Sequence, residues 1–510
     1  MVNKNLHLPN SYFFKRKWYL CLLFFLIFFA LFLRFYNFPL RYGLGDETVR
    51  DAVVGIQGAR DLQLPLVGAF SSAGPFTFGP WYYYQLIIFS LVFPSPYASW
   101  IYLSLGSVLC VVVLYKIGEL VENRAFGLFL AFLGTLSPVL IIAGTHLTTQ
   151  NLTNIYALLA VWIFLKLSLQ KLSNWWGFIF GIVLGIGVNL HYQMAGLLIL
   201  PIILLAYKPK RFLYFFTSLV GIGVTFLPLL FFDLNNHWFT FRNLLYYFQY
   251  GKNAIYVPNR WLFYLRDFWP SYWGDVIGIS TIFASLIMLV FILIIIRQIQ
   301  KKKLSIYMIL LLLAFAVNFI LLRYYWGPRF FGYLNFLRPF VFLFTGYVFF
   351  TIYKTINKKY ALLLIAAFLA IIILPKSIKH LDIDPFSTEM IKRVQAIEVN
   401  YPDKKFKVYG CKGVFGGWHT ATTKSLVFLL EGKNKFSDSG VKLGVHDSSC
   451  KYSSLESLTI NDEQYPLISN TGIIDFSRAT DSWLKETGWI PISFRSISDE
   501  ITRWWFKEQP

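Results

Sequence analysis

Charged residues are scarce in this chain: Asp, Glu, Lys and Arg make up 14% of its 510 residues. Soluble domains carry about 25% charged residues, so the composition excludes a soluble globular protein. Cysteine is also rare, and four residues exclude a disulfide scaffold or a Cys-rich metal framework. The chain is instead 56% hydrophobic and 19% aromatic, with a mean hydropathy of +0.54. This composition is typical of a polytopic membrane protein.

The net charge of +21 is distributed unevenly. Residues 1–375 hold 29 Lys and Arg against 9 Asp and Glu, whereas residues 376–510 hold 18 against 17. The basic excess therefore lies between apolar stretches, where it sets the orientation of the chain in a membrane. No soluble part carries the basic patch that nucleic-acid binding requires, so we expect no nucleic-acid partner.

Eleven apolar runs approach the roughly 20 residues that a membrane-spanning helix needs. They cover residues 18–36, 97–115, 125–143, 152–168, 175–190, 194–207, 212–232, 276–296, 304–322, 336–353 and 360–375. A further run, 81–93, has only 13 residues and ends at Pro94 and Pro96. We interpret it as an interfacial or re-entrant helix that does not cross.

The positive-inside rule supports this interpretation. If 81–93 does not cross, the cytoplasmic segments are 1–17, 116–124, 166–173, 208–211, 297–303 and 353–360. These segments hold 18 Lys and Arg, and the short opposite loops 144–151 and 191–193 hold none. The predicted outer face of a plasma membrane then carries residues 37–96, 233–275, 323–338 and 376–510.

The composition changes at residue 375, after which charged residues become common. We predict a transmembrane domain over 1–375 and a small extracytoplasmic α/β domain over 376–510. In the second domain, the patterns at 405–411, 441–446 and 465–469 predict strands, and 423–430 predicts a helix. Cys411 and Cys450 both lie there, and the sequence leaves open whether they form a disulfide.

The first outer loop, 37–96, concentrates acids in a region that has few. Asp46, Glu47, Asp51 and Asp61 fall within sixteen positions, and the first two follow the turn Gly43-Leu44-Gly45. Carboxylates at a helix start can simply cap the helix. They can also act as a general base or metal ligand at the outer face. The same loop continues with the Gly/Pro and aromatic stretch 68–84, which includes Tyr83 and predicts either an interfacial aromatic belt or a groove for an isoprenoid chain or a sugar.

Further polar residues stand at the predicted outer ends of helices, where they are either solvated or functional. They are His146, His191, Tyr192 and Asp233. Their histidines lack the close spacing of a zinc site. The segment 323–338 carries Arg323, Arg329 and Arg338 without any acid. Guanidinium groups there either bind an anion such as phosphate or extend to lipid headgroups.

These features together resemble the GT-C superfamily of polytopic glycosyltransferases, and among them the glycosyltransferase family 39-like branch of protein mannosyltransferases and aminoarabinose transferases. The matching elements are Gly45-Asp46-Glu47 after the first helix, Gly79-Pro80-Trp81-Tyr82-Tyr83-Tyr84, Leu136-Ser137-Pro138 and His191-Tyr192. The resemblance covers roughly residues 18–375. It implies an α-helical polytopic GT-C fold with about eleven transmembrane helices plus an interfacial helix.

The resemblance also implies roles for individual residues. Asp46 would be the catalytic base, and Glu47 would position acceptor or donor. Arg329, Arg338 and Arg323, with Tyr83, would bind the lipid phosphate of the donor. Many relatives have His or Lys beside the loop proline, whereas Phe78 and Gly79 precede Pro80 here, so the resemblance leaves open which cation of that loop contacts the donor. The remaining candidates for the acceptor or the loop are Asp51, His146, His191, Tyr192 and Asp233.

The implied reaction is inverting transfer of a monosaccharide from a polyprenyl-phosphate donor to a protein, lipid or glycan acceptor. No nucleotide-binding glycine motif is visible, which fits a lipid-linked donor. The sequence identifies no cofactor, and it leaves open whether the reaction requires a divalent metal. A lipid or glycolipid transporter, or flippase, is the alternative, although transporters usually place ionisable residues at mid-membrane and show repeats. A non-enzymatic envelope assembly protein is a further alternative.

Overall fold

The computed structural model describes residues 11–71, 74, 76–250, 261–325, 329–356, 358, 360–411, 420–446, 457–460, 463–468 and 472–499. The chain forms two compact units. The helical unit comprises Met1–Tyr36, Ser104–Gly144 and Gln150–Leu381, and the mixed unit comprises Asn37–Leu103, Thr145–Thr149 and Asp382–Pro510.

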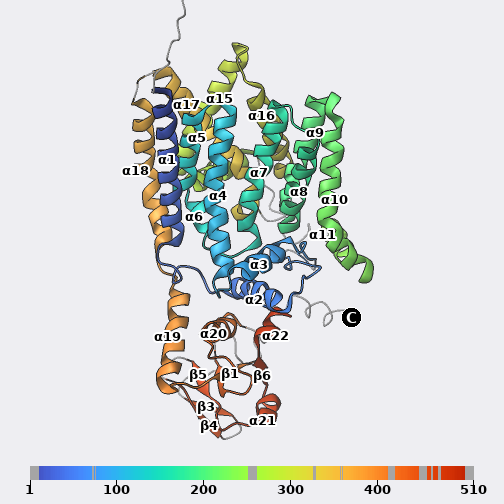
Figure 1. Ribbon diagram of the computed structural model, residues 1–510, viewed down its shortest axis with the longest axis vertical. Helices are drawn as coiled ribbons and strands as arrows, with labels where there is room; N and C mark the ends of the chain where they lie inside the picture. Colours follow the sequence, from blue (N-terminus) through green and yellow to red (C-terminus); the bar gives the residue numbers. More distant parts are fainter. Residues whose placement is uncertain are drawn as a thin grey trace, which may run out of the picture. The chain divides into compact units, whose positions relative to one another are not determined.

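The helical unit consists of helices throughout its described part (Figure 1). The longer ones are α1 (Ser11–Phe35), α4 (Ala98–Val121), α5 (Arg124–Leu136), α7 (Thr149–Leu169), α8 (Trp175–Leu190), α10 (Phe212–Asn235), α11 (Phe239–Tyr250), α15 (Thr281–Gln300), α16 (Ile306–Tyr324), α17 (Arg338–Ile356) and α18 (Ala361–Ile378). The shorter ones are α6 (Pro138–Ala143), η1 (Tyr192–Leu198), α9 (Ile199–Tyr207), η2 (Pro209–Arg211), α13 (Trp261–Phe263), the π-helical η3 (Tyr264–Phe268), α14 (Trp269–Ile277), η4 (Phe331–Leu337) and η5 (Lys379–Leu381).

Within the described residues, eight helices are long and apolar enough to cross a membrane. They coincide with eight of the eleven predicted runs, so the chain is a multi-pass membrane protein. The other three runs lie in shorter apolar helices, namely Arg124–Leu136, Trp175–Leu190 and Tyr192–Tyr207. The predicted interfacial run is also a shorter helix, Trp81–Val92. Crossing by the three shorter helices stays a prediction.

Two predicted runs differ in detail from the helices observed. The run 125–143 is broken at Ser137, whose ψ of 119° is extended, because a residue before proline is forced out of the α region and Pro138 starts a new helix. The predicted run 276–296 starts within the preceding helix, α14. This helix ends at Ile277 and is followed by Gly278, whose φ of 89° is a left-handed conformation that favours glycine. Helix α15 then starts after the N-cap Ser280.

Helices α8 and α10 pack side by side through small residues (Figure 1). A Cβ atom added to Gly181 would collide with the backbone of Ser218, and one added to Gly221 would collide with the backbone of Phe178. Small residues let helix backbones approach closely, which is how helices gain packing energy when lipid removes the hydrophobic drive for association.

The mixed unit combines helices from the first outer loop with the C-terminal α/β fold. Its helices are α2 (Asp46–Asp61), α3 (Trp81–Val92), α19 (Pro385–Asn400), α20 (Ala421–Gly432), α21 (Asp481–Glu486) and α22 (Phe494–Ser498). Its strands are β1 (Phe406–Cys411), β2 (Val441–Val445), β3 (Ser457–Ile460), β4 (Glu463–Pro466), β5 (Ile473–Asp475) and β6 (Trp489–Ile492).

Four of these strands form a mixed sheet in the order β5-β2-β1-β6, and β3 pairs with β4 in a separate two-stranded sheet. Strand β1 runs parallel to β2 and antiparallel to β6. The core of the sheet buries Tyr409, Phe476 and Trp489. The α/β character predicted for the C-terminal region is therefore confirmed. Cys411 is disulfide-bonded, whereas Cys450 lies outside the described residues.

Backbone and side-chain hydrogen bonds tie the first outer loop to the C-terminal residues within the mixed unit. The hydroxyl of Ser387 accepts from the Leu44 N–H at 3.1 Å and donates to the Tyr42 carbonyl at 3.1 Å. The hydroxyl of Ser425 donates to the Leu44 carbonyl at 2.7 Å. The composition change at residue 375 therefore does not coincide with the compact units, which group the loop with the C-terminal part.

Candidate active site

The acid pair of the first loop stands at the start of α2. Gly45 is the N-cap residue, and no side chain caps the helix. Thr48 stabilises the turn instead, since its hydroxyl contacts the carbonyls of Gly43 and Gly45 at 2.9 and 2.8 Å. Asp46 and Glu47 are exposed first-turn residues, where their charges favour the helix dipole without bonding to it.

Asp46 has a partner that sequence reasoning did not find. Its Oδ1 forms an ion pair with the Nζ of Lys424, which lies on α20. The side chain of Lys424 is 1% exposed, whereas that of Asp46 is 54% exposed. The loop acid thus faces solvent on one side and a buried ammonium on the other. No sequence signal pointed to this pairing, because 378 residues separate the two side chains.

Asp51 is the buried acid of the cluster, at 2% exposure. Its Oδ1 accepts from the Arg50 guanidinium at 2.9 and 3.0 Å and from the Tyr83 hydroxyl at 2.9 Å. Burial raises the pKa of the Asp51 carboxyl above its usual range, and the charge of Arg50 opposes that rise. The bond to Tyr83 joins α2 to α3, so Asp51 has a structural use.

Replacing Tyr83 by phenylalanine tests that use. The change removes one donor from the buried Asp51 carboxylate, and hydrogen bonds to charged groups contribute about 1.5–3 kcal/mol. We expect the free energy of unfolding to fall by about that amount, measured by thermal or denaturant unfolding in detergent. Tyr84→Phe is the matched control, because Tyr84 is half-buried at the next position of α3. Equal losses in the two variants would contradict the bond's importance.

The Gly/Pro stretch after α2 forms a narrow pair of extended segments. The N–H of Gly68 donates to the Phe78 carbonyl at 2.9 Å, and the N–H of Phe78 donates to the Ala69 carbonyl at 3.0 Å. A Cβ atom on Gly68 would collide with the Gly79 carbonyl, so glycine is required for this close approach. The aromatic run then begins α3, directly after this shaped loop.

His146 also belongs to the mixed unit and is exposed. A Cβ atom built on Gly43 would lie 3.5 Å from Cε1 of His146. The histidine therefore lies beside the turn that leads into Asp46.

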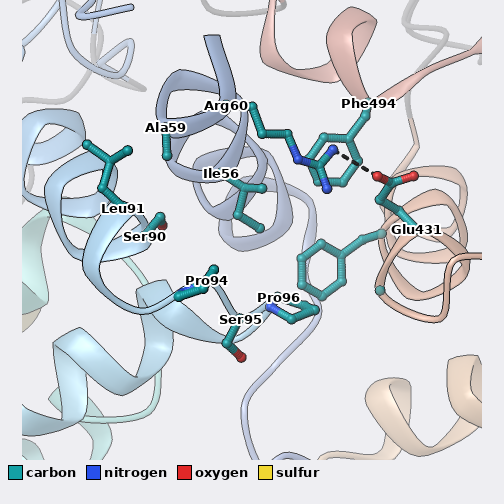
Figure 2. Close-up of a pocket in the computed structure, with 12 residues that line it drawn as sticks. Ile56, Ala59, Arg60, Ser90, Leu91, Pro94, Ser95, Pro96, Glu431 and Phe494 are labelled. Atoms are coloured by element: carbon teal, nitrogen blue, oxygen red, sulfur yellow. Dashed lines mark ion pairs between the residues drawn. The ribbon is translucent and has the colours of Figure 1, made fainter. Parts of the chain in front are cut away.

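The C-terminal half of α2 borders a cavity of about 380 Å³ in the same unit. Figure 2 shows Arg60, whose guanidinium pairs with Glu431 at 2.8 Å and lies over the ring of Phe494, 5.1 Å from its centroid. Apolar side chains including Ile56 and Leu91 complete the wall. The cavity lies at the opposite end of α2 from Asp46.

The predicted phosphate ligands lie in the helical unit, and Arg338 is the most buried of them at 6% exposure. Its Nη1 donates to the Asn154 Oδ1 at 2.8 Å, and Asp275 and Tyr272 lie within electrostatic reach. Its Nε has no hydrogen-bond partner among the described residues. An enclosed guanidinium does not match a side chain that extends to lipid headgroups.

The other two arginines are engaged differently. Nη2 of Arg329 donates to the carbonyls of Arg323 and Tyr325 at 3.1 and 2.8 Å. The Arg323 guanidinium lies over the ring of Trp261, 5.2 Å from its centroid. Both contacts hold the guanidinium groups among aromatic side chains and backbone.

The remaining candidates have local contacts in the helical unit. His191 is 7% exposed, and its ring centroid lies 4.9 Å from that of Tyr333. Tyr192 begins η1 directly after it. The Asp233 carboxylate accepts from the N–H groups of Thr240 and Phe241 at 2.8 and 3.0 Å, so it caps the start of α11. Among the residues that the structure describes, no group of three His, Cys, Asp or Glu side chains is arranged to bind a metal.

The candidate residues thus form two groups. Asp46, Glu47, Asp51, Tyr83 and His146 belong to the mixed unit. The helical unit carries Arg323, Arg329, Arg338, His191, Tyr192 and Asp233. Beyond the predicted residues, the structure adds Lys424 and Arg50 as partners of two of the acids.

The structure is similar to solved structures of ArnT. ArnT from Cupriavidus metallidurans in the apo state matches 91% of this chain and 98% of its own, with a TM-score of 0.53 and 10% identity. ArnT bound to undecaprenyl phosphate matches 81% and 84%, with a TM-score of 0.55 and 10% identity.

The Archaeoglobus fulgidus oligosaccharyltransferase in its apo form gives a TM-score of 0.48 at 14% identity over 76% of this chain, and the match spans 59% of that protein's length. No protein-family model and no curated protein matches the sequence. At these identities the likeness establishes the fold, and the ArnT match covers nearly the whole of both chains. The chain therefore has the same fold as ArnT.

Proposed function

We propose that this chain is a membrane glycosyltransferase that moves a monosaccharide from a polyprenyl-phosphate donor to an acceptor on the outer membrane face. The ArnT-like fold supports the class, and ArnT has been crystallised with undecaprenyl phosphate. The main structural support for the proposed chemistry is the environment of Asp46. Its carboxylate is half exposed at the start of α2, and one of its oxygens is bound by Lys424.

The proposed reaction inverts the anomeric carbon. Asp46 takes the proton of the acceptor hydroxyl, and the acceptor oxygen forms the new bond to the anomeric carbon. The bond from that carbon to the phosphate oxygen breaks on the opposite face, and the polyprenyl phosphate leaves with the electron pair. The charge of the leaving phosphate needs a cation, and the candidate for this role in the helical unit is Arg338, since guanidinium groups bind phosphoryl oxygens.

Purified protein tests the proposal directly. In detergent or vesicles, it should transfer or release a radiolabelled sugar from a synthetic polyprenyl-phosphate donor, and Asp46→Asn should not. Mass spectrometry of glycolipids and glycoproteins from cells with and without the protein should identify the acceptor as a species that gains a sugar only in its presence. Donor that crosses a vesicle bilayer intact, with no sugar transfer, would point instead to a transporter.

The proposed site requires the mixed unit to lie outside the cytoplasm. The basic residues of the six short segments predict this orientation. A phosphatase reporter that works only outside the cytoplasm, fused after Pro510, should therefore be active. The complementary control is a reporter that works only inside, which should be silent at the same position. Reversed activities would mean that Trp81–Val92 crosses and that the whole topology is inverted.

A further inference from the structure

Lys424 is a lysine almost without solvent contact, in the middle of a buried stretch of α20. Its side chain is 1% exposed, and its neighbours Thr423 and Ser425 are also buried. Burying an ammonium group costs several kcal/mol unless an opposite charge accompanies it. The carboxylate of Asp46 provides such a charge from the first outer loop.

The lysine is the fixed member of this pair. Thr420 is the N-cap of α20, and its hydroxyl accepts from the Thr423 N–H at 3.2 Å. The Ser425 hydroxyl donates to the Leu44 carbonyl at 2.7 Å. These contacts fix the helix against the turn that precedes Asp46. The ion pair therefore fixes the position of the half-exposed Asp46 side chain.

The ion pair uses only one of the two carboxylate oxygens of Asp46. Lys424 binds Oδ1, and no described residue is hydrogen-bonded to Oδ2. A carboxylate with one oxygen anchored and the other open has a defined direction for accepting a proton. The same helix also contacts the far end of α2, where Glu431 binds Arg60 at 2.8 Å. Two ion pairs from α20 thus fix the helix that carries the acid.

From this arrangement we propose that Lys424 is a positioning residue that holds Asp46 in the orientation required for transfer. The role rests on the proposed function of Asp46 as base. Because Lys424 is buried, it acts through the carboxylate and does not itself contact the donor. The C-terminal region, which carried none of the residues predicted for the site from the sequence, then contributes directly to the active site.

Kinetics of Lys424→Met test the role. Removing the ammonium leaves Asp46 free to rotate, and misplacement by about 1 Å can reduce turnover by about 10²-fold. We expect kcat per folded molecule to fall by roughly 10- to 100-fold with little change in KM for the donor. Lys424→Arg, which keeps the charge, should retain more turnover. The matched control is Lys433→Met, which breaks an exposed pair with Glu398 and should leave kcat unchanged.

The double variant separates positioning from simple stabilisation. In an Asp46→Asn background, adding Lys424→Met should not lower turnover further, because the two residues act as one unit. It should also raise the melting temperature above that of Asp46→Asn, since it removes a buried charge from which the first change took the Asp46 carboxylate.

Three outcomes count against the role. If Lys424→Met lowers the melting temperature but leaves kcat per folded molecule at the parent value, the role is overturned while the proposed function stands. Additive losses of turnover in the double variant would give Lys424 a role independent of Asp46. If the parent transfers no sugar from any polyprenyl-phosphate donor, the proposed function and this role both fail.

Discussion

Asp46→Asn is expected to reduce turnover by roughly 10²–10⁴-fold in protein that is correctly folded and inserted. Asparagine keeps the size of the side chain but does not accept a proton at neutral pH. Because no side chain caps α2, loss of a cap does not contribute to the effect. The measurement is sugar transfer from a polyprenyl-phosphate donor, normalised to folded protein.

Stability must be measured alongside turnover, because Asp46→Asn removes the carboxylate next to a buried ammonium. Breaking a fully buried ion pair costs about 3–5 kcal/mol, and this pair should cost less since Asp46 is half exposed. The Asp46→Asn/Lys424→Met variant is the structural control, since it removes both charges. It should recover stability while remaining inactive.

The neighbouring acids provide the comparison that assigns the base. Glu47→Gln should reduce turnover less than Asp46→Asn, because Glu47 is exposed at the next position and the role predicted for it is to position acceptor or donor. Asp51→Asn should mainly lower stability, because asparagine keeps one acceptor oxygen but removes the negative charge that pairs with Arg50. If Asp46→Asn has normal turnover while Glu47→Gln or Asp51→Asn is inactive, the role of catalytic base belongs to the residue whose variant is inactive. Normal turnover in all three variants would leave the proposed glycosyl transfer without a catalytic base among these acids.

Features that depend on local sequence were predicted well. Hydrophobic length and the scarcity of charge indicated the helices, and eight of the eleven predicted runs lie in helices able to span a membrane. Period-2 alternation indicated β1 and β2 within one residue of their ends. The two boundary differences, at Ser137 and Gly278, arose where a proline or a left-handed residue divides an apolar run whose hydropathy does not change.

Features that depend on long-range pairing were not predicted. The sequence identified Asp46 as chemically important but gave no reason to look at Lys424, which is one of 18 basic residues after residue 375. Asp51 looked like another loop acid, yet burial beside Arg50 and Tyr83 gives it a structural use. Pairing of this kind depends on how α20 and α3 pack against α2, which composition and periodicity do not encode.

Arg338→Ala is the second change for which a large effect is expected, on binding of the donor. The Arg338 guanidinium is enclosed in the helical unit, and Asn154 occupies its Nη1, whereas its Nε has no partner among the described residues. A hydrogen bond to a charged group contributes about 1.5–3 kcal/mol, which corresponds to roughly 10- to 100-fold in donor affinity. Acceptor affinity should change much less.

Variants at the same segment distinguish a phosphate ligand from a structural cation. Arg338→Lys keeps the charge but loses the planar fork that binds phosphate oxygens in pairs, so its donor affinity should lie between those of the parent and Arg338→Ala. Arg329→Ala should also weaken donor binding, but it additionally removes the bonds to the Arg323 and Tyr325 carbonyls. Arg323→Ala should have the smallest effect, because its guanidinium already lies over Trp261.

Direct binding of a fluorescent polyprenyl phosphate to each folded variant measures these differences. Unchanged affinity in both Arg338→Ala and Arg329→Ala would leave the phosphate without either predicted ligand, and the donor's anion site would have to be sought among other cations of the chain.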